Sequence, residues 1–214
     1  GLSGLEYAFW MWVGGGNELV NKMIAGKNIK ILTNALVTTP EVFLQSKKEL
    51  KSVADIKGLK IRTTGDDGEC FTKMGASVIF LPGAEIYQSI QRGVIDAAQL
   101  STPAVDWTFA IHEVAKFQYL SPVRQPNDPT WVFVNTKKWA ELPDDLKKIV
   151  EEVHYAHGYR WYARLTQDDL KALEKQKAYG VKVQPIPKDI EDELIKQGNA
   201  LYAEKSAKDA LYAE

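Results

Sequence analysis

The stretch that decides the fold class covers residues 53–100 and reads VADIKGLKIRTTGDDGECFTKMGASVIFLPGAEIYQSIQRGVIDAAQL. Three short apolar runs, near residues 59–62, 77–81 and 94–100, alternate in it with two amphipathic segments. Apolar runs that alternate with helical patterns are typical of parallel β-α-β units. The stretch therefore predicts strand, helix, strand, helix and strand, in an α/β protein.

Two polar residues stand at the expected carboxyl ends of these strands. Arg62 ends the first strand and Gln99 lies at the end of the last. In open parallel sheets, ligands bind just beyond the carboxyl ends of the strands. A guanidinium matches a carboxylate or phosphate with two parallel hydrogen bonds and keeps its charge at any working pH. Arg62 is therefore a candidate binding residue, and the alternative for it is a surface ion pair.

Composition narrows the function classes. Lys and Arg total 27 and Asp and Glu total 28, a formal net charge of −1, which gives no electrostatic argument for a nucleic-acid partner. Hydrophobic residues make up 45%, enough for a packed core. We expect no membrane span and no signal peptide in this sequence. The single cysteine, Cys70, allows no internal disulfide, and we expect it to be a buried helix residue.

Outside the central stretch, apolar runs and turn residues predict further strands. They cover residues 28–37, 117–120, 130–134 and 180–185, and a short strand or bend covers residues 41–45. No strand is evident before residue 13, where glycines and aromatic residues predominate.

Helix signals follow a different set of residues. Ser52 is the expected cap of one helical turn, and residues 65–68 are expected to form a loop before the first helix. A helical pattern begins at Pro143 and continues to Gly180, as one helix that crosses two lobes or as two helices joined near residues 166–168. A final helix is expected at residues 190–204.

Other candidate sites have simpler structural interpretations. The glycines at residues 14–16 lack the Lys and Ser/Thr of a phosphate loop, so a structural turn is favoured. Glu151, His154 and His157 form one helix face, but a di-metal carboxylate site needs such motifs on several helices, so a solvated face is favoured. No nucleophile-elbow pattern accompanies any histidine.

Several motifs occur together in an order that is known from one protein family. They are VADIKGLKIR at residues 53–62, KMGA at 73–76, EIYQSIQRGVIDAA at 85–98 and VNTKKW at 134–139. In this order the chain resembles the solute-binding proteins of TRAP transporters, the DctP-type receptors. Within that family it is most similar to the branch that binds 2-oxo acids, lactate and related compounds (the mannitol/chloroaromatic type).

The resemblance implies an α/β, two-lobed fold of the type II periplasmic-binding-protein kind, with a long helix that spans both lobes and with parts missing at both ends. It divides the chain into the remainder of lobe I at 1–36, the α/β unit of lobe II at 37–100, a return to lobe I at 101–140, a connecting helix at 141–180 and the last strand and helix of lobe II at 181–214.

The resemblance also assigns roles to particular residues. Arg62 matches the arginine that grips the ligand carboxylate in the family. Gln99 and Leu100 stand where the oxo-acid branch commonly has Glu and Trp. Glu41 falls at the place of an upstream Gln, so Glu41 and Gln99 are a candidate pair of ligands for calcium or sodium, which bind oxygen.

An aromatic wall for the ligand is a second consequence of the missing Trp. Trp131 or Trp107 are the candidates for it, and core packing is the alternative for each.

The sequence therefore predicts an extracytoplasmic, periplasmic receptor that binds a small organic acid and delivers it to the membrane permease subunits of a TRAP transporter. No organic cofactor and no nucleic acid are expected, and the full-length parent is expected to be able to form a homodimer. Two alternatives from other classes stay open: an α/β enzyme that acts on a small carboxylate, and a metal-dependent interaction module without a small ligand.

Overall fold

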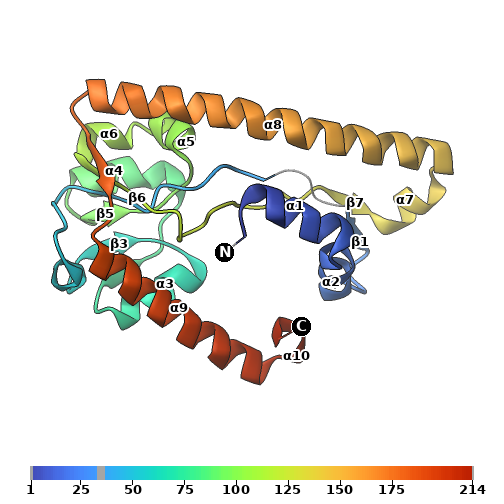
Figure 1. Cartoon of the computed structure of the whole chain (residues 1–214), viewed down its shortest axis with the longest axis horizontal. Coiled ribbons are helices and arrows are strands. Elements are labelled where there is room, and N and C mark those ends of the chain that lie inside the picture. Colours follow the sequence, from blue (N-terminus) through green and yellow to red (C-terminus); the bar gives the residue numbers. More distant parts are fainter. Residues whose placement is uncertain (1, 33–36, 214) are drawn as a thin grey trace. The chain divides into compact units, whose positions relative to one another are not determined.

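The computed structural model describes residues 2–32 and 37–213, and the chain divides into two compact units (Figure 1). Unit 1 comprises Gly1–Pro40 and Gln125–Asp168, and unit 2 comprises Glu41–Arg124 and Asp169–Glu214. Each unit is therefore assembled from two separate segments of the chain. Among the described residues, no helix has the length and apolar character that crossing a membrane requires.

Unit 2 contains a six-stranded sheet and the helices that cover it. The strands are β2 (Leu44–Ser46), β3 (Lys60–Arg62), β4 (Ser77–Ile79), β5 (Ala97–Ala98), β6 (Phe117–Leu120) and β8 (Lys182–Pro185). The helices are η1 (Val53–Ile56), α3 (Gly65–Lys73), η2 (Gly83–Glu85), α4 (Ile86–Gln91), α5 (Pro103–Thr108), α6 (Ile111–Val114), α9 (Lys188–Lys208) and α10 (Ala210–Ala213). The strand order is β4-β3-β5-β2-β6-β8, in which β2 runs antiparallel to both of its neighbours and the other pairs are parallel.

The predicted order of the central stretch is confirmed, because β3, α3, β4, α4 and β5 follow one another along the chain. Two details were wrong. Residues 65–68 are not a loop but the first turn of α3, where two aspartates interact favourably with the helix dipole. The last strand is only Ala97–Ala98, because the residues before it form the turn at Gly93, whose φ of +75° suits glycine.

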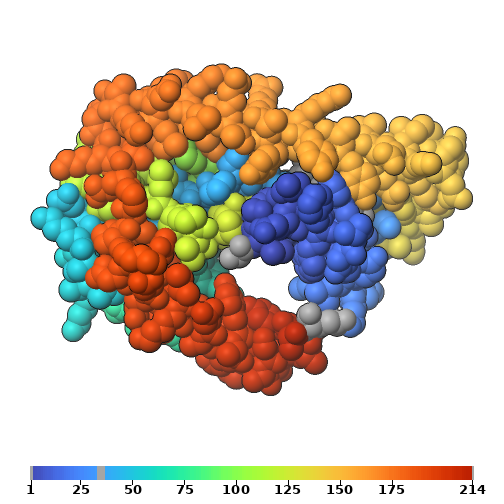
Figure 2. Space-filling model, viewed as in Figure 1, coloured from blue at the N-terminus to red at the C-terminus, as the bar shows by residue number. Residues whose placement is uncertain are grey.

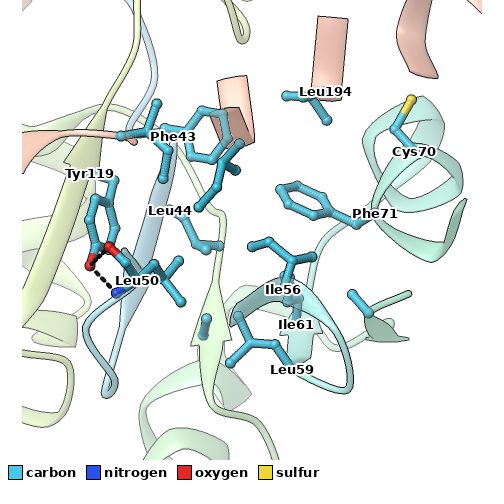
Figure 3. Packing of buried hydrophobic residues seen from close by; sticks show 14 of the residues in the cluster. Phe43, Leu44, Leu50, Ile56, Leu59, Ile61, Cys70, Phe71, Tyr119 and Leu194 are labelled. Atoms are coloured by element: carbon cyan, nitrogen blue, oxygen red, sulfur yellow. Dashed lines mark hydrogen bonds between the residues drawn. The ribbon is translucent and has the colours of Figure 1, made fainter. Parts of the chain in front are cut away.

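One face of this sheet carries an apolar core beneath α3 and α9 (Figure 3). Phe71 of α3 meets Phe43 edge to face, with ring centroids 6.1 Å apart, and both side chains are fully buried. The hydroxyl of Tyr119 accepts a hydrogen bond from the backbone N–H of Leu50 at 2.6 Å, shown dashed in Figure 3. Cys70 is 3% exposed in the same cluster, as predicted, and burial raises the pKa of its thiol.

The other face of the sheet is covered by α4 and α6. Ala97 belongs to the first cluster and Ala98 to the second, because successive strand residues point to opposite faces. The second cluster contains Ile86, Ile90, Ile95, Ala98, Ile111 and Ala115. Helices on both faces therefore make unit 2 a three-layer α/β/α arrangement.

Helix α9 is held to α3 by charge as well as by apolar packing. Lys205 pairs with Asp66 and, at 3.3 Å, with Glu69 of α3. The hydrogen bond from Lys205 to Asp66 holds the pKa of this lysine above its usual value. The outer face of α9, red in Figure 2, lies at the molecular surface.

Unit 1 is smaller and mostly helical. It contains α1 (Gly4–Val13), α2 (Gly16–Met23), α7 (Thr136–Glu141), the first part of α8 (Asp144–Ala178) and an antiparallel pair of strands, β1 (Ile29–Ile31) and β7 (Phe133–Asn135). Its core cluster consists of Tyr7, Met11 and Val37, against which partly buried aromatic residues pack.

Helix α8 settles one of the open alternatives. Residues 144–178 form one continuous helix, not two helices joined near residues 166–168. The boundary between the units falls inside it, between Asp168 and Asp169.

Several expected boundaries need correction. Helix α1 covers Gly4–Val13, where no strand was evident and no helix was predicted, and Ser3 and Glu6 form a capping box at its N-terminus. Strand β1 ends at Ile31 rather than 37, and residues 33–36 of the expected strand lie outside the described residues. The chain returns to unit 1 at Gln125 rather than at 101, because β6 pairs with β2 and β8 in the sheet of unit 2.

Candidate functional site

One edge of the sheet in unit 2 gathers polar side chains from distant parts of the chain. Strands β3, β4, β5, β6 and β8 point the same way and β2 points the opposite way, so five carboxyl ends and the amino end of β2 share this edge. We call it the carboxyl edge. The side chains that define it are Glu41, Arg62, Asp67, Gln99 and Arg124. The edges where parallel strands end are the usual ligand sites of open α/β sheets.

Arg62 is held in place by backbone carbonyl groups. Its Nε donates to the carbonyl oxygen of Leu81 at 2.9 Å, and its Nη1 donates to that of Gln99 at 2.5 Å. Nη2 has no hydrogen-bond acceptor among the described residues, and the side chain is half-buried. Burial lowers the pKa of Arg62, an effect that the nearby carboxylates of Asp106 and Glu41 oppose. The guanidinium is thus oriented by the protein while one of its nitrogens stays available to an anion.

The side chain of Gln99 links neighbouring segments through two hydrogen bonds. Thr63 donates its hydroxyl hydrogen to Oε1 of Gln99 at 2.5 Å, and Nε2 of Gln99 donates to the carbonyl oxygen of Phe43 at 2.8 Å. Gln99 is 2% exposed. Both ends of its amide are therefore used inside the protein.

Two linked ion pairs, both made by Arg124, lie beside Gln99. Nη1 of Arg124 is 2.8 Å from Oε2 of Glu41, and Nε of Arg124 is 2.7 Å from Oδ2 of Asp67. Nη1 also donates to the carbonyl oxygen of Val42 at 2.8 Å. The side chains of Arg124 and Glu41 are each 8% exposed, so this pair is shielded from water. Removing one partner of such a pair leaves a buried charge without its counter-ion.

These contacts do not fit a metal site made by Glu41 and Gln99. Calcium takes six to eight oxygen ligands at about 2.3–2.6 Å, several of them carboxylates. Here the carboxylate of Glu41 is the counter-ion of a guanidinium, and the amide oxygen of Gln99 accepts from Thr63. Within residues 2–32 and 37–213, no group of three His, Cys, Asp or Glu side chains could hold a metal ion.

The apolar candidates are engaged in packing. Leu100 is half-buried against the cluster under α4 and α6. Trp107 stacks on His112, with ring centroids 3.8 Å apart. Trp131 belongs to unit 1, where it packs against the core cluster of that unit. A ligand contact by Trp131 or Leu100 stays a prediction.

Sequence reasoning missed Arg124, and a signal for it existed. Arg124 follows the strand at residues 117–120, and the rule that singled out Arg62 and Gln99 applies equally to that strand end. The prolines around residues 122–129 made the segment look like an ordinary loop. Its two partners, Glu41 and Asp67, are far away in sequence and become neighbours only through the sheet order.

The remaining candidates show no chemistry of their own. His154 is 9% exposed, and burial lowers its pKa, while His157 is exposed on α8. Gly14 and Gly15 form the turn between α1 and α2, where Gly15 has a φ of +89°, and Gly16 begins α2.

Comparison with known proteins gives a consistent set of matches. The family model described as bacterial extracellular solute-binding protein, family 7 (DctP) matches residues 4–209. A monocarboxylate 2-oxoacid-binding periplasmic protein of Nostoc sp. is 30% identical over 214 residues. That match covers 100% of this chain and 58% of the Nostoc protein.

Two solved structures are similar over the whole chain. A TRAP periplasmic solute-binding protein from Colwellia psychrerythraea, with bound calcium and pyruvate, has a TM-score of 0.92 and 30% identity, and 65% of it is covered. Its counterpart from Pseudoalteromonas atlantica, with bound sodium and pyruvate, has a TM-score of 0.87 and 31% identity, and 65% of it is covered. The chain therefore spans less than two thirds of the length of these relatives.

Proposed function

Because the chain belongs to family 7 of the bacterial extracellular solute-binding proteins, we propose that it carries the carboxylate-binding edge of a TRAP-type solute receptor. The observation that carries this proposal is the geometry of Arg62. Two backbone carbonyl groups fix its guanidinium at the carboxyl edge, and Nη2 is left for a ligand. A charge-assisted hydrogen bond at such a place is the interaction that a carboxylate needs.

The ligand that we propose is a small 2-oxo acid such as pyruvate. The Nostoc relative is named for 2-oxoacid binding, and the Colwellia and Pseudoalteromonas proteins hold pyruvate. A monocarboxylate also suits an edge where the guanidinium of Arg62 has no carboxylate partner among the described residues, whereas Arg124 is already paired with two carboxylates.

The cellular setting follows from the family. We propose that the protein works outside the cytoplasm, in the periplasm, and hands its ligand to TRAP permease subunits. A homodimer of the whole protein stays a prediction. The enzyme alternative is set aside, because the family and the solved relatives are solute-binding proteins.

Pyruvate binding measured by isothermal titration calorimetry tests this function. Arg62→Gln removes the charge but keeps much of the side-chain length, and hydrogen bonds to charged groups contribute about 1.5–3 kcal/mol. We therefore expect the variant to bind pyruvate about 10- to 150-fold more weakly than the unmodified protein. Unchanged affinity in Arg62→Gln would contradict the assignment.

The matched control is Arg92→Gln, at an exposed arginine that follows α4. We expect this variant to bind pyruvate as the unmodified protein does. Recovery of pyruvate unchanged after long incubation separates a receptor from an enzyme that consumes it.

A further inference from the structure

We propose that Arg124 takes the place of a metal cation at the carboxyl edge, so that this chain binds its carboxylate ligand without calcium or sodium. The ligand part of this inference rests on the proposed function. Its metal part concerns only Arg124 and the carboxylates around it, and it can be measured without any ligand.

The first argument is the position of the guanidinium. It lies between the carboxylates of Glu41 and Asp67, at 2.8 Å and 2.7 Å, and it also binds the carbonyl oxygen of Val42. Carboxylate and carbonyl oxygens are the ligands that a hard cation would collect. In this chain the guanidinium of Arg124, a planar cation with five N–H donors, binds these oxygens instead.

The second argument is the balance of charge. Glu41 and Asp67 supply two negative charges, and Arg124 and Arg62 supply two positive ones. The five side chains that define the edge are therefore neutral together without an added ion, with the carboxyl group of Asp106 lying outside this set. A divalent cation beside Arg124 would bring an uncompensated positive charge to a site where the Glu41–Arg124 pair is only 8% exposed, and like charges repel strongly where water is excluded.

The third argument concerns the amide that would complete a metal site. Nε2 of Gln99 must face the carbonyl oxygen of Phe43, which fixes the direction of Oε1 toward Thr63. Turning Oε1 to a metal would leave the Thr63 hydroxyl, which belongs to a residue 2% exposed, to find another acceptor.

The alternative is that Arg124 is only a structural ion pair and that an ion still binds nearby. Dependence on metal separates the two. Pyruvate affinity is measured by calorimetry in sodium-free buffer, once with a chelator and once with calcium. We expect the two dissociation constants to agree within about twofold. A loss of about tenfold or more on chelation, or a requirement for sodium, would overturn the proposal.

A direct calcium titration of the ligand-free protein gives an independent readout. We expect no binding heat and no change in melting temperature. Saturable calcium binding that Glu41→Gln removes would overturn the proposal. If pyruvate fails to bind under every condition, the proposed function fails, and this titration still decides the metal question.

Two variants at one position sharpen the test. Arg124→Gln leaves two carboxylates without their counter-ion, so calcium should raise its melting temperature by several degrees. Arg124→Lys keeps the positive charge and should stay insensitive to calcium. A folded Arg124→Gln protein whose melting temperature does not change with calcium would contradict the idea that Arg124 occupies a cation position. If Arg124→Gln does not fold, the unmodified protein and Arg124→Lys still provide the decisive measurements.

Discussion

At the scale of single residues, the buried carboxyl group of Asp106 shows how this fold accommodates an acidic side chain near Arg62 and Glu41. Asp106 is 1% exposed and accepts from the backbone N–H of Ser101 at 3.0 Å and from Nε2 of Gln45 at 2.5 Å. Burial raises the pKa of Asp106 well above its ordinary value, although these hydrogen bonds oppose the shift. Among the residues that the structure describes, Oε1 of Gln45 meanwhile has no hydrogen-bond partner.

This arrangement predicts a pH-dependent effect of Asp106→Asn. A carboxyl group whose pKa is raised in the folded state binds its proton more tightly there, so stability falls as pH rises above the unfolded pKa, toward the folded one. The neutral amide avoids this loss, and it can donate to Oε1 of Gln45 once the Gln45 amide turns over, because Nε2 of Gln45 faces this carboxyl group in the unmodified protein. The variant should therefore gain stability relative to the unmodified protein by up to about 1.4 kcal/mol per pH unit across that window.

Urea unfolding at about pH 5 and about pH 8 checks this expectation. The exposed carboxylate of Asp145 supplies the control, Asp145→Asn, in which no such trend is expected. A stability difference between the Asp106 variant and the unmodified protein that stays constant with pH would refute the prediction.

Tyr119 offers a second test at this scale. Its hydroxyl accepts from Leu50 N–H at 2.6 Å inside the core (Figure 3). Tyr119→Phe keeps the ring but leaves that buried N–H without its acceptor, which costs about 1–3 kcal/mol. Chemical denaturation measures the loss. Tyr202→Phe, at a side chain that is 50% exposed, should change stability by less than about 0.5 kcal/mol.

At the scale of elements, α3 couples the sheet to α9. Phe71 of α3 is fully buried against Phe43, whereas Phe80, after β4, is 72% exposed. Phe71→Ala should therefore lower the free energy of unfolding by about 3–5 kcal/mol, because it opens a cavity between the sheet and the helix. The same change at Phe80 should cost less than about 1 kcal/mol. Similar losses at both positions would mean that α3 does not pack as described.

The sequence predicted elements best where one local rule applied. Strand 117–120 and the alternation around α3 and α4 carry clear periodicity, and the structure confirms them. Helix α1 was missed because its aromatic and glycine-rich composition masks the cap at Ser3. The beginning of β5 depended on the turn at Gly93 rather than on apolar content.

The candidate site was predictable only in part, and the reason is topological. Arg62 and Gln99 lie at the ends of adjacent strands in one continuous stretch, so local reading finds them. The ion pairs of Arg124 join three segments that are distant in sequence. Their meeting depends on the antiparallel insertion of β2 between β5 and β6, which apolar periodicity does not predict.

At the scale of the whole molecule, the two units differ in how much apolar surface they bury. In the described part of the chain, unit 2 has two apolar clusters around a six-stranded sheet, whereas unit 1 has one small cluster and a two-stranded sheet. Isolated two-stranded pairs are marginally stable, and local stability follows buried apolar contact. The backbone amides of unit 2 should therefore be better protected from hydrogen exchange than those of unit 1.

Hydrogen exchange followed by mass spectrometry tests this difference. Amides in β2, β3 and β6 should exchange most slowly, and amides in β1, β7 and α2 should exchange earlier. Denaturant titration should correspondingly show probe-dependent transitions. Equal protection of the two units, together with one transition seen by all probes, would contradict the expectation.

The pairing of β8 with β6 has a consequence for how the protein is made. Strand β6 ends at Leu120, but its parallel partner begins only at Lys182, after the whole second segment of unit 1. At usual rates of synthesis that interval lasts several seconds, during which an unpaired strand edge would be open to wrong partners. A chain with this layout benefits from being kept unfolded until translation is complete. Binding by a chaperone, or a delay in chain collapse, would then raise the yield of folded protein. Slow pairing between distant segments would limit its refolding rate.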